Sequence, residues 1–293
     1  MRPRSSRSRA GERARALVVL ALVSAAGCRA RAQEGASTAD AAPAPSTPTS
    51  IATSTSTPSS TSTARASPSV TAEDLPVIGY APAVVIPPAP SSARRPVVLV
   101  AHGFDDRAEN QCDVWRGIVE GRAYVVCPRG IPVAGSSTQG QTYNGAMALA
   151  KEVEGVLAAF HRRYAAVADD SALVFAGFSL GAVLGVSIPQ RDPSRFPYVV
   201  LTEGGEDAWT TNDTKYFHDH GGKRVLLMCA LAIRVSTAEI ARDRFTKSGA
   251  DARVVLAKAP GKPEYVHWYD GPVAEQIHAN LDWLVEGDAR WAR

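Results

Sequence analysis

The sequence predicts an α/β domain in which helices cover both faces of a mostly parallel sheet. Short, continuous apolar runs alternate with longer stretches of helical periodicity from about residue 75 to the C-terminus. A glycine-rich turn at residues 177–181 joins one apolar run to the helix that follows it. Because a right-handed helical crossover returns the chain to the same edge of a sheet, this alternation favours parallel strands.

The apolar runs are the predicted strands. Residues 77–86 carry one or two short strands, interrupted by Pro82. The later runs lack the apolar and polar alternation of a half-exposed strand, so we expect them to be buried on both faces. These strands are expected at residues 96–101, 123–127, 172–176, 198–201, 224–228 and 252–256.

Helices are predicted between these strands. Residues 143–164 place apolar side chains on one side of a helix. Ser236 with Glu239 matches a capping box, so a helix is expected from there to about Ser248. Pro272 is suited to the first position of a last helix, which ends near Val285.

The N-terminal residues 1–28 have the pattern of an export signal. Six arginines precede an apolar run at residues 17–26, and this run is about 10 residues long, against about 20 for a spanning helix. The run ends in small residues before Cys28, which resembles the lipobox of bacterial lipoproteins, with Ala25 where leucine is usual. We therefore expect Cys28 to carry a lipid that anchors the protein to the cell envelope. The alternative is ordinary cleavage and secretion.

Residues 29–75 are the predicted linker, and residues 76–293 the predicted folded domain. In residues 35–70, 31 of 36 positions are Ser, Thr, Pro or Ala. Such a segment buries too little apolar surface to offset the entropy of ordering it, so a flexible linker is expected.

Charge is distributed unevenly along the chain. The formal net charge is +3, but residues 1–70 contain 9 Arg and 3 acidic residues, a net charge of +6. Residues 71–293 contain 23 basic and 26 acidic residues, a net charge of −3. The folded domain therefore has no basic bias toward nucleic acid, and none is expected as a partner.

The turn at residues 177–181 reads Gly-Phe-Ser-Leu-Gly, with a strand before it and a helix after it. In this G-x-S-x-G context the serine occupies a strained turn that lifts its hydroxyl above the sheet. The glycines let the strand and helix approach without clashing Cβ atoms. The pattern predicts that Ser179 is a nucleophile.

Three features together resemble the α/β-hydrolase superfamily, in particular its small esterases, thioesterases and dienelactone hydrolases. They are Ser179, the run His102-Gly103-Phe104 after a strand, and a histidine late in the chain. The resemblance covers residues 76–293 and implies a carboxylesterase-type serine hydrolase that forms an acyl-enzyme on Ser179. It also implies that the backbone N–H groups of Phe104 and Leu180 bind the oxyanion and that His102 is structural.

His267 is the predicted general base. It lies between the strand at 252–256 and the last helix, where the superfamily has its catalytic histidine. We expect surface or loop positions for His161, His218, His220 and His278. The pair His218 and His220 has no further ligands nearby, so no metal site is predicted.

The acid is where the sequence departs from the superfamily. The usual carboxylate would follow the strand at 224–228, but residues 229–235 contain none, and Glu239 is assigned to helix capping. Glu203 follows the neighbouring strand, about one strand spacing of 4.8 Å away, and is the main candidate. Asp207 is the second candidate, and a site without an acid is the third possibility.

The cysteines test this topology. In the superfamily's sheet order, the strand of Cys127 lies four strands from that of Cys229, about 19 Å apart and beyond the roughly 7 Å that a disulfide spans. Cys112 is expected to open the helix after the oxyanion loop, at the same edge as Cys127. The resemblance thus implies a Cys112–Cys127 disulfide and a buried, free Cys229.

The expected substrate is a small ester, because the segment from 202 to 223 is too short for a large lid. Phe178, Trp209 and Trp268 either line an acyl pocket or pack in the core. We expect a monomer without cofactor or metal, which contacts a membrane only through its lipid. The alternatives are a polymer or peptide hydrolase at the cell surface and an inactive binding protein with this fold.

Overall fold

The computed structural model of the chain describes residues 71–258 and 267–292. The predicted signal peptide and most of the predicted linker lie outside these residues. The predicted boundary at residue 75 is too late, because strand β1 (Glu73–Leu75) already pairs with β2 (Ala83–Ile86), with Glu73 opposite Val85. The folded domain therefore begins by Glu73.

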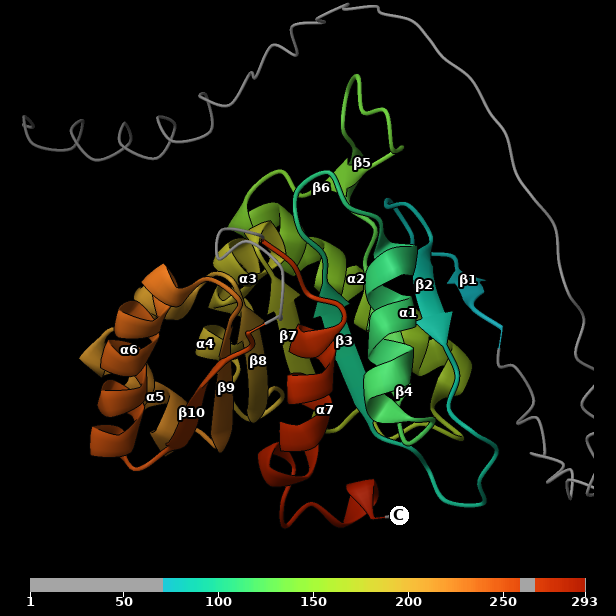
Figure 1. Cartoon of the computed structure of the whole chain (residues 1–293). Coiled ribbons are helices and arrows are strands. Elements are labelled where there is room, and N and C mark those ends of the chain that lie inside the picture. The colour runs from blue at the N-terminus through green and yellow to red at the C-terminus, as the bar shows by residue number, and fades with distance from the viewer. Residues whose placement is uncertain (1–70, 259–266, 293) are drawn as a thin grey trace, which may run out of the picture. The chain divides into compact units, whose positions relative to one another are not determined.

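Eight strands form one sheet in the order β1-β2-β4-β3-β7-β8-β9-β10 (Figure 1). All neighbours from β4 to β10 are parallel, whereas β2 pairs antiparallel with both β1 and β4. The predicted α/β class is therefore confirmed. The other strands are β3 (Val97–Ala101), β4 (Tyr124–Cys127), β7 (Val174–Phe178), β8 (Tyr198–Thr202), β9 (Arg224–Cys229) and β10 (Asp251–Leu256).

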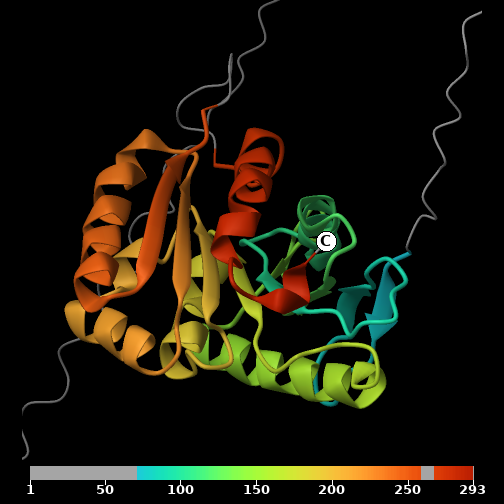
Figure 2. The same ribbon diagram turned by 90° about the horizontal axis from the view of Figure 1, so that it is seen from below.

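Helices cover both faces of the sheet (Figures 1 and 2). One face packs on α1 (Ala108–Val119) and α7 (Pro272–Leu284). Alternate strand residues face the two cores, so that the central strands β3, β4, β7, β8 and β9 are buried on both sides and their sequences are almost continuously apolar. The outer strands β1 and β10 keep exposed and half-buried residues. The opposite face packs on α2 (Ala146–Tyr164), α3 (Leu180–Gly185), α4 (Ser187–Arg191), α5 (Thr211–Asp219) and α6 (Val235–Ser248).

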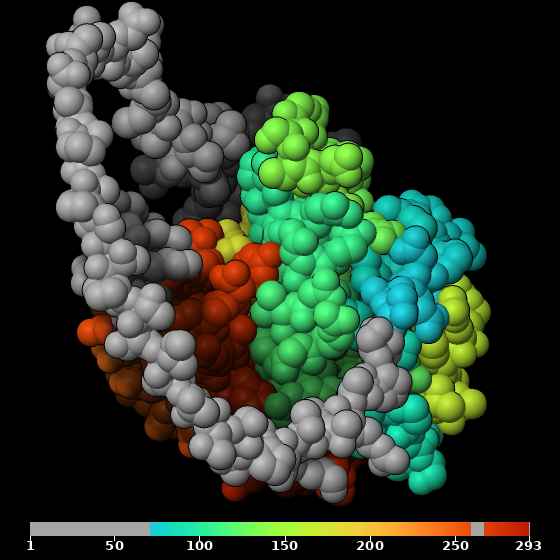
Figure 3. All heavy atoms as spheres, turned by 45° about the vertical axis from the view of Figure 1, so that its right-hand side comes forward, coloured from blue at the N-terminus to red at the C-terminus, as the bar shows by residue number. Residues whose placement is uncertain are grey.

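A separate hairpin of β5 (Ile131–Pro132) and β6 (Gln141–Thr142) extends from the body of the domain. In the space-filling view it rises above the ridge formed by α1 (Figure 3). It follows β4 in the chain, so it belongs to the edge of the sheet at which the parallel strands end.

The predicted capping box of α6 is wrong. A short 3-10 turn, Ala232–Arg234, precedes the helix, and Arg234 is the N-cap residue without a side-chain cap. Glu239 is instead half-exposed and faces Arg242. The capping box that does form is that of α5, between Thr210 and Asp213, in a segment for which no helix was predicted.

Other boundaries also move. Strand β7 continues to Phe178, directly before Ser179, rather than ending at residue 176. Helix α1 begins at Ala108, so Cys112 lies in its second turn and does not open the helix. Residues 77–82 form no strand; the second strand of this region is β1, earlier in the chain.

The disulfide follows the prediction. Cys112 of α1 and Cys127 at the end of β4 are bonded, with Cα atoms 6.1 Å apart. Strand β9, which carries Cys229, lies four positions from β4, and the Cys229 thiol is buried and free. Within residues 71–258 and 267–292, we find no helix that is both long enough and apolar enough to span a membrane.

Candidate active site

Ser179 occupies the turn between β7 and α3. Its backbone has φ 51° and ψ −118°, a conformation that residues with a Cβ rarely adopt. The turn is held by its own N–H group, which donates to the carbonyl oxygen of Thr202 at 2.9 Å. Strained residues of this kind persist only where the surrounding structure holds them, and they gather at functional sites.

The glycines beside Ser179 are required by close packing. A Cβ atom on Gly177 would lie 2.6 Å from the Cα atom of Ala182. A Cβ atom on Gly181 would lie 2.3 Å from the carbonyl oxygen of Ala101 in β3. Both distances are far below van der Waals contact, so the G-x-S-x-G spacing is explained by the geometry of the turn.

The loop after β3 lies against Ser179. A Cβ atom on Gly103 would be 3.3 Å from the Cβ atom of Ser179. The backbone that leads into Phe104 therefore passes next to the candidate nucleophile. The Phe104 side chain is 60% exposed. This is the loop whose Phe104 N–H group was predicted to bind an oxyanion together with that of Leu180.

His102 supports this loop from inside the protein. It is fully buried, and its ring nitrogens lie 2.7 Å from the carbonyl oxygen of Gly103 and 3.0 Å from that of Arg129. Its backbone N–H donates to the Tyr143 hydroxyl. Burial lowers the pKa of His102, although the two carbonyl contacts oppose that effect. These contacts agree with a structural role.

Glu203 and His267 are hydrogen-bonded, with Nδ1 of His267 3.1 Å from Oε2 of Glu203. The Glu203 side chain is completely buried, whereas that of His267 is 38% exposed. An N–H donated from Nδ1 leaves the lone pair on Nε2, so we assign that tautomer from the contact. The ring of Phe178, directly before Ser179, lies 4.9 Å from the His267 ring. The imidazole thus lies beside the turn that carries Ser179.

Glu203 extends across one strand spacing. It follows the last residue of β8 with φ 57°, and its N–H donates to the carbonyl oxygen of Met228 in β9. Its Oε1 accepts hydrogen bonds from the N–H groups of Ala230 and Leu231, the second at 3.1 Å. The carboxylate therefore stands just beyond the end of β9, where the superfamily's acid was expected and where the sequence has none.

The electrostatics keep Glu203 ionised. Burial by itself would raise the pKa of this carboxyl. The hydrogen bonds from His267 and from the Leu231 and Ala230 N–H groups lower it by more, so its pKa lies below the ordinary value. A charged carboxylate is thus held against the Nδ1 side of the imidazole.

Arg234 and Glu206, which the sequence analysis did not identify, complete the surroundings of Glu203. The Nε atom of Arg234 is 3.7 Å from Oε2 of Glu203. Its Nη1 donates to Oε1 of Glu206 at 2.6 Å. No sequence signal indicates this, because Arg234 is placed by the unpredicted 3-10 turn before α6. Asp207, the second candidate acid, is exposed.

The predicted pocket aromatics have different surroundings. Phe178 is buried and contacts the rings of His267 and Tyr269. Trp209 is fully buried on the face of the sheet that α5 and α6 cover, where its ring contacts one phenylalanine of each helix. Of the two roles considered for it, it therefore packs in the core. Trp268 is also buried, in the core on the α1 and α7 face.

The other histidines lie on helices. His161 of α2 is exposed and bonds Asp170, as a surface residue. His278 of α7 is only partly exposed, and its Nδ1 bonds the carbonyl oxygen of Ile118 in α1, so it joins the two helices rather than pointing freely into solvent.

His218 and His220 were expected in a loop. His218 instead belongs to α5, and His220 is the residue at its C-terminal end. The His220 ring stacks on that of Tyr216. Over the described parts of the chain, no group of three or more His, Cys, Asp or Glu side chains is arranged to hold a metal ion.

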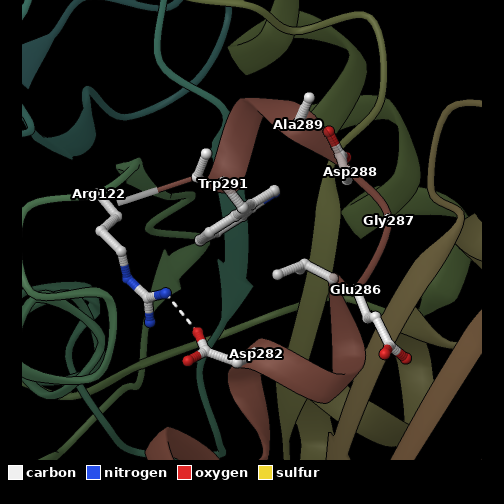
Figure 4. Close-up of a pocket in the computed structure, with 9 residues that line it drawn as sticks. Arg122, Asp282, Glu286, Gly287, Asp288, Ala289 and Trp291 are labelled. Atoms are coloured by element: carbon white, nitrogen blue, oxygen red, sulfur yellow. Dashed lines mark hydrogen bonds and ion pairs between the residues drawn. The ribbon is translucent and has the colours of Figure 1, made fainter.

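A cavity of about 520 Å³ lies elsewhere, beside the short turn Ala289–Trp291 (Figure 4). Arg122 and Asp282 form an ion pair at its side. Arg122 precedes β4, so the cavity is at the edge where the parallel strands begin, whereas Ser179 is at the edge where they end. It is therefore separate from the candidate active site.

This chain resembles known proteins in its structure. No protein-family model matches the sequence, and no curated protein matches it. Among solved structures, TT1662 from Thermus thermophilus is 15% identical with a TM-score of 0.53, covering 74% of this chain and 99% of its own.

Two further structures are similar over the same share of this chain. A putative dienelactone hydrolase from Klebsiella pneumoniae subsp. pneumoniae MGH 78578 is 15% identical, with a TM-score of 0.53 and coverage of 74% of this chain and 98% of its own. An S-formylglutathione hydrolase from Agrobacterium tumefaciens is 16% identical, with a TM-score of 0.51 and coverage of 74% and 94%. At these identities the likeness concerns the fold: the described residues, 71–258 and 267–292, have the α/β-hydrolase fold.

Proposed function

We propose that the protein is a serine hydrolase that cleaves small carboxylic esters through an acyl-enzyme on Ser179. The observation that carries the proposal is the hydrogen bond between buried, ionised Glu203 and His267, beside the strained turn of Ser179. Nucleophile, base and acid are then Ser179, His267 and Glu203. The likeness in fold to esterases and related hydrolases supports the same class.

In the first half of the reaction, His267 Nε2 accepts the proton of the Ser179 hydroxyl as its oxygen attacks the ester carbonyl carbon. The carbonyl π electrons move to oxygen and form a tetrahedral oxyanion. Glu203 stabilises the imidazolium that results. When the intermediate collapses, the C–O bond to the alcohol breaks, and the alcohol leaves with the proton from Nε2.

Water completes the reaction. It gives a proton to His267 Nε2 while its oxygen attacks the acyl carbon, and the proton then returns to Ser179 as the acid is released. In each half, the N–H groups of Phe104 and Leu180 donate to the oxyanion. Such a donor is typically worth about 3–4 kcal/mol of transition-state stabilisation.

A small substrate fits the short connections at this edge. Between β8 and β9 the chain contains only one short 3-10 turn and the nine-residue helix α5. A second candidate function is hydrolysis of a polymeric ester at the cell surface, favoured by exposed apolar side chains after the strand ends. These are Phe104, Val183 and Ile233. An inactive binding protein would be favoured if no acid lay near His267. Glu203 is hydrogen-bonded to His267, so this alternative is disfavoured.

An ester assay tests the proposal. Purified protein is expected to hydrolyse p-nitrophenyl acetate and butyrate, and Ser179→Ala and His267→Ala are expected to abolish turnover. His161→Ala, which removes an exposed histidine, is the matched control and should retain full activity. Turnover of short esters that survives in Ser179→Ala would refute the role of Ser179. Turnover of a polyester film without turnover of short esters would favour the second candidate.

A further inference from the structure

An imidazole and a guanidinium face one oxygen of Glu203. Oε2 accepts a hydrogen bond from His267 Nδ1 at 3.1 Å, and Arg234 Nε lies 3.7 Å from the same atom. Glu203 itself is fully buried, while Arg234 is 34% exposed. The imidazole and the guanidinium therefore share one buried anion, and a positive charge on both at once would be repulsive.

Glu206 limits that competition. Its buried carboxylate accepts from Arg234 Nη1 at 2.6 Å, much closer than Arg234 approaches Glu203. Arg234 comes from the turn before α6, and Glu206 from the 3-10 turn Glu206–Ala208 that follows β8. The guanidinium thus lies between two buried carboxylates, and its shorter contact is with Glu206.

The other titratable groups at this cluster have limited effects. Asp207 is exposed and acts on Arg234 from the same turn as Glu206. Burial, with the nearby Glu206 and Glu203 carboxylates, raises the pKa of the Cys229 thiol to about 12, so the thiol stays neutral over the working pH range. Burial, with the nearby Asp106, also raises the pKa of Tyr269, whose ring contacts Phe178, so this phenol is neutral too. Among the described residues, the charges in contact with Glu203 besides His267 are therefore those of Arg234 and, through it, Glu206.

We propose that Arg234 and Glu206 are positioning residues that set the pH at which His267 becomes a competent base. The inference rests on the proposed function, in which His267 must be neutral to accept the Ser179 proton. Arg234 holds the imidazole neutral to lower pH, and Glu206 weakens that effect by bonding the guanidinium. Removing either residue should therefore shift the active pH range, in opposite directions.

A merely structural ion pair makes a different prediction. If Arg234 and Glu206 only join the turn after β8 to the start of α6, their loss lowers the melting temperature and leaves the titration of His267 unchanged. Stability alone cannot separate the two roles, whereas the titration midpoint of His267 can.

The test is an NMR titration of the histidine side chains in the full-length protein. The His267 resonances are those missing from the spectrum of His267→Gln. In Arg234→Gln the His267 midpoint should rise by about 0.5–1 pH unit, and in Glu206→Gln it should fall by a similar amount. Arg234→Lys should stay closer to wild type. The double variant Arg234→Gln/Glu206→Gln, which leaves neither charge unpaired, should return near the wild-type midpoint.

Arg242→Gln is the matched control, since it removes an arginine of the same helix region that pairs only with surface carboxylates. Its midpoint should equal that of wild type. Unchanged midpoints in both single variants, or shifts of the same sign, would overturn the proposal. If Arg234→Gln does not fold, Glu206→Gln and the double variant still decide the matter.

Kinetics separate this inference from the proposed function. The decrease of kcat/KM at acid pH should follow the His267 midpoint. Arg234→Gln should therefore have up to about tenfold lower kcat/KM than wild type at low pH and the same kcat/KM at high pH. Shifted midpoints in a protein that hydrolyses no ester would leave the electrostatic inference standing and reject the proposed function. An active enzyme with unshifted midpoints would support the proposed function and reject the electrostatic inference.

Discussion

The Glu203 carboxylate is an ion kept in the interior by its partners. It accepts hydrogen bonds from two backbone N–H groups after β9 and from the Nδ1–H of His267, and Arg234 lies beside it. A buried charge without such partners would protonate or destabilise the fold. The same contacts fix the orientation and tautomer of the imidazole, which is what a general base needs.

Glu203→Gln is expected to lower kcat/KM for p-nitrophenyl acetate by about 10³–10⁴-fold, because a neutral amide neither favours the tautomer nor stabilises the imidazolium. Circular dichroism should show a folded protein. Asp207→Asn, at the exposed second candidate, serves as the control and should remain active. Full activity in Glu203→Gln would remove Glu203 from the proposed mechanism.

Stability should depend on Glu203 in acid. Since its pKa is lowered on folding, its contribution is fully present above the unfolded value of about 4.5 and is lost as pH falls through the lower folded value. The difference in unfolding free energy between wild type and Glu203→Gln should therefore shrink as the pH falls below about 4.5. Urea unfolding at pH 7, 5 and 3.5 measures it, and a difference that grows toward low pH would contradict the assignment.

Secondary-structure elements were predictable where local pattern and tertiary structure agree. The five central strands are buried on both faces, so their apolar runs identified them; they are β3, β4, β7, β8 and β9. The start of α6 was not predictable, because a 3-10 turn precedes the helix. Arg234, in this turn, forms an ion pair with Glu206, a contact that local sequence does not indicate. Strand β1 was missed for a similar reason: its three residues, Glu-Asp-Leu, are strand only because β2 offers a free edge.

The disulfide between α1 and β4 should stabilise the domain without serving the chemistry. It closes a loop of 15 residues, for which the chain-entropy model gives about 3 kcal/mol. Cys112→Ser/Cys127→Ser should lower the unfolding free energy by about that amount and leave ester hydrolysis intact at 25 °C. Reductant should destabilise the wild type and leave the double variant unaffected; equal sensitivity of both would contradict the bond.

At the scale of the whole molecule, the parallel sheet brings distant segments to one edge. The loop after β3, the Ser179 turn after β7 and Glu203 after β8 all follow strand ends, and the Glu203 carboxylate lies just past the end of β9. Sequence could therefore indicate Ser179 from its motif, and His267 and Glu203 from their places after strands together with the resemblance to the α/β-hydrolase superfamily. It could not indicate Arg234 or Glu206, because their contact depends on the exact course of two turns.

The location of the whole protein rests on Cys28, outside the described residues. With a lipid on Cys28, wild-type protein expressed in a bacterial host should fractionate with membranes, and Cys28→Ser should appear in the soluble exported fraction. Cys229→Ala is the control and should stay with the membranes. Equal solubility of wild type and Cys28→Ser would favour plain secretion.

Labelling with a fluorophosphonate shows directly whether Ser179 is an activated nucleophile, because this reagent phosphonylates the nucleophilic serine of serine hydrolases. We expect one modified residue, Ser179, identified by peptide mass spectrometry, and no labelling in Ser179→Ala or His267→Ala. A wild-type protein that remains unlabelled under conditions in which a known serine esterase reacts fully would contradict the claim that Ser179, His267 and Glu203 form a working hydrolase site.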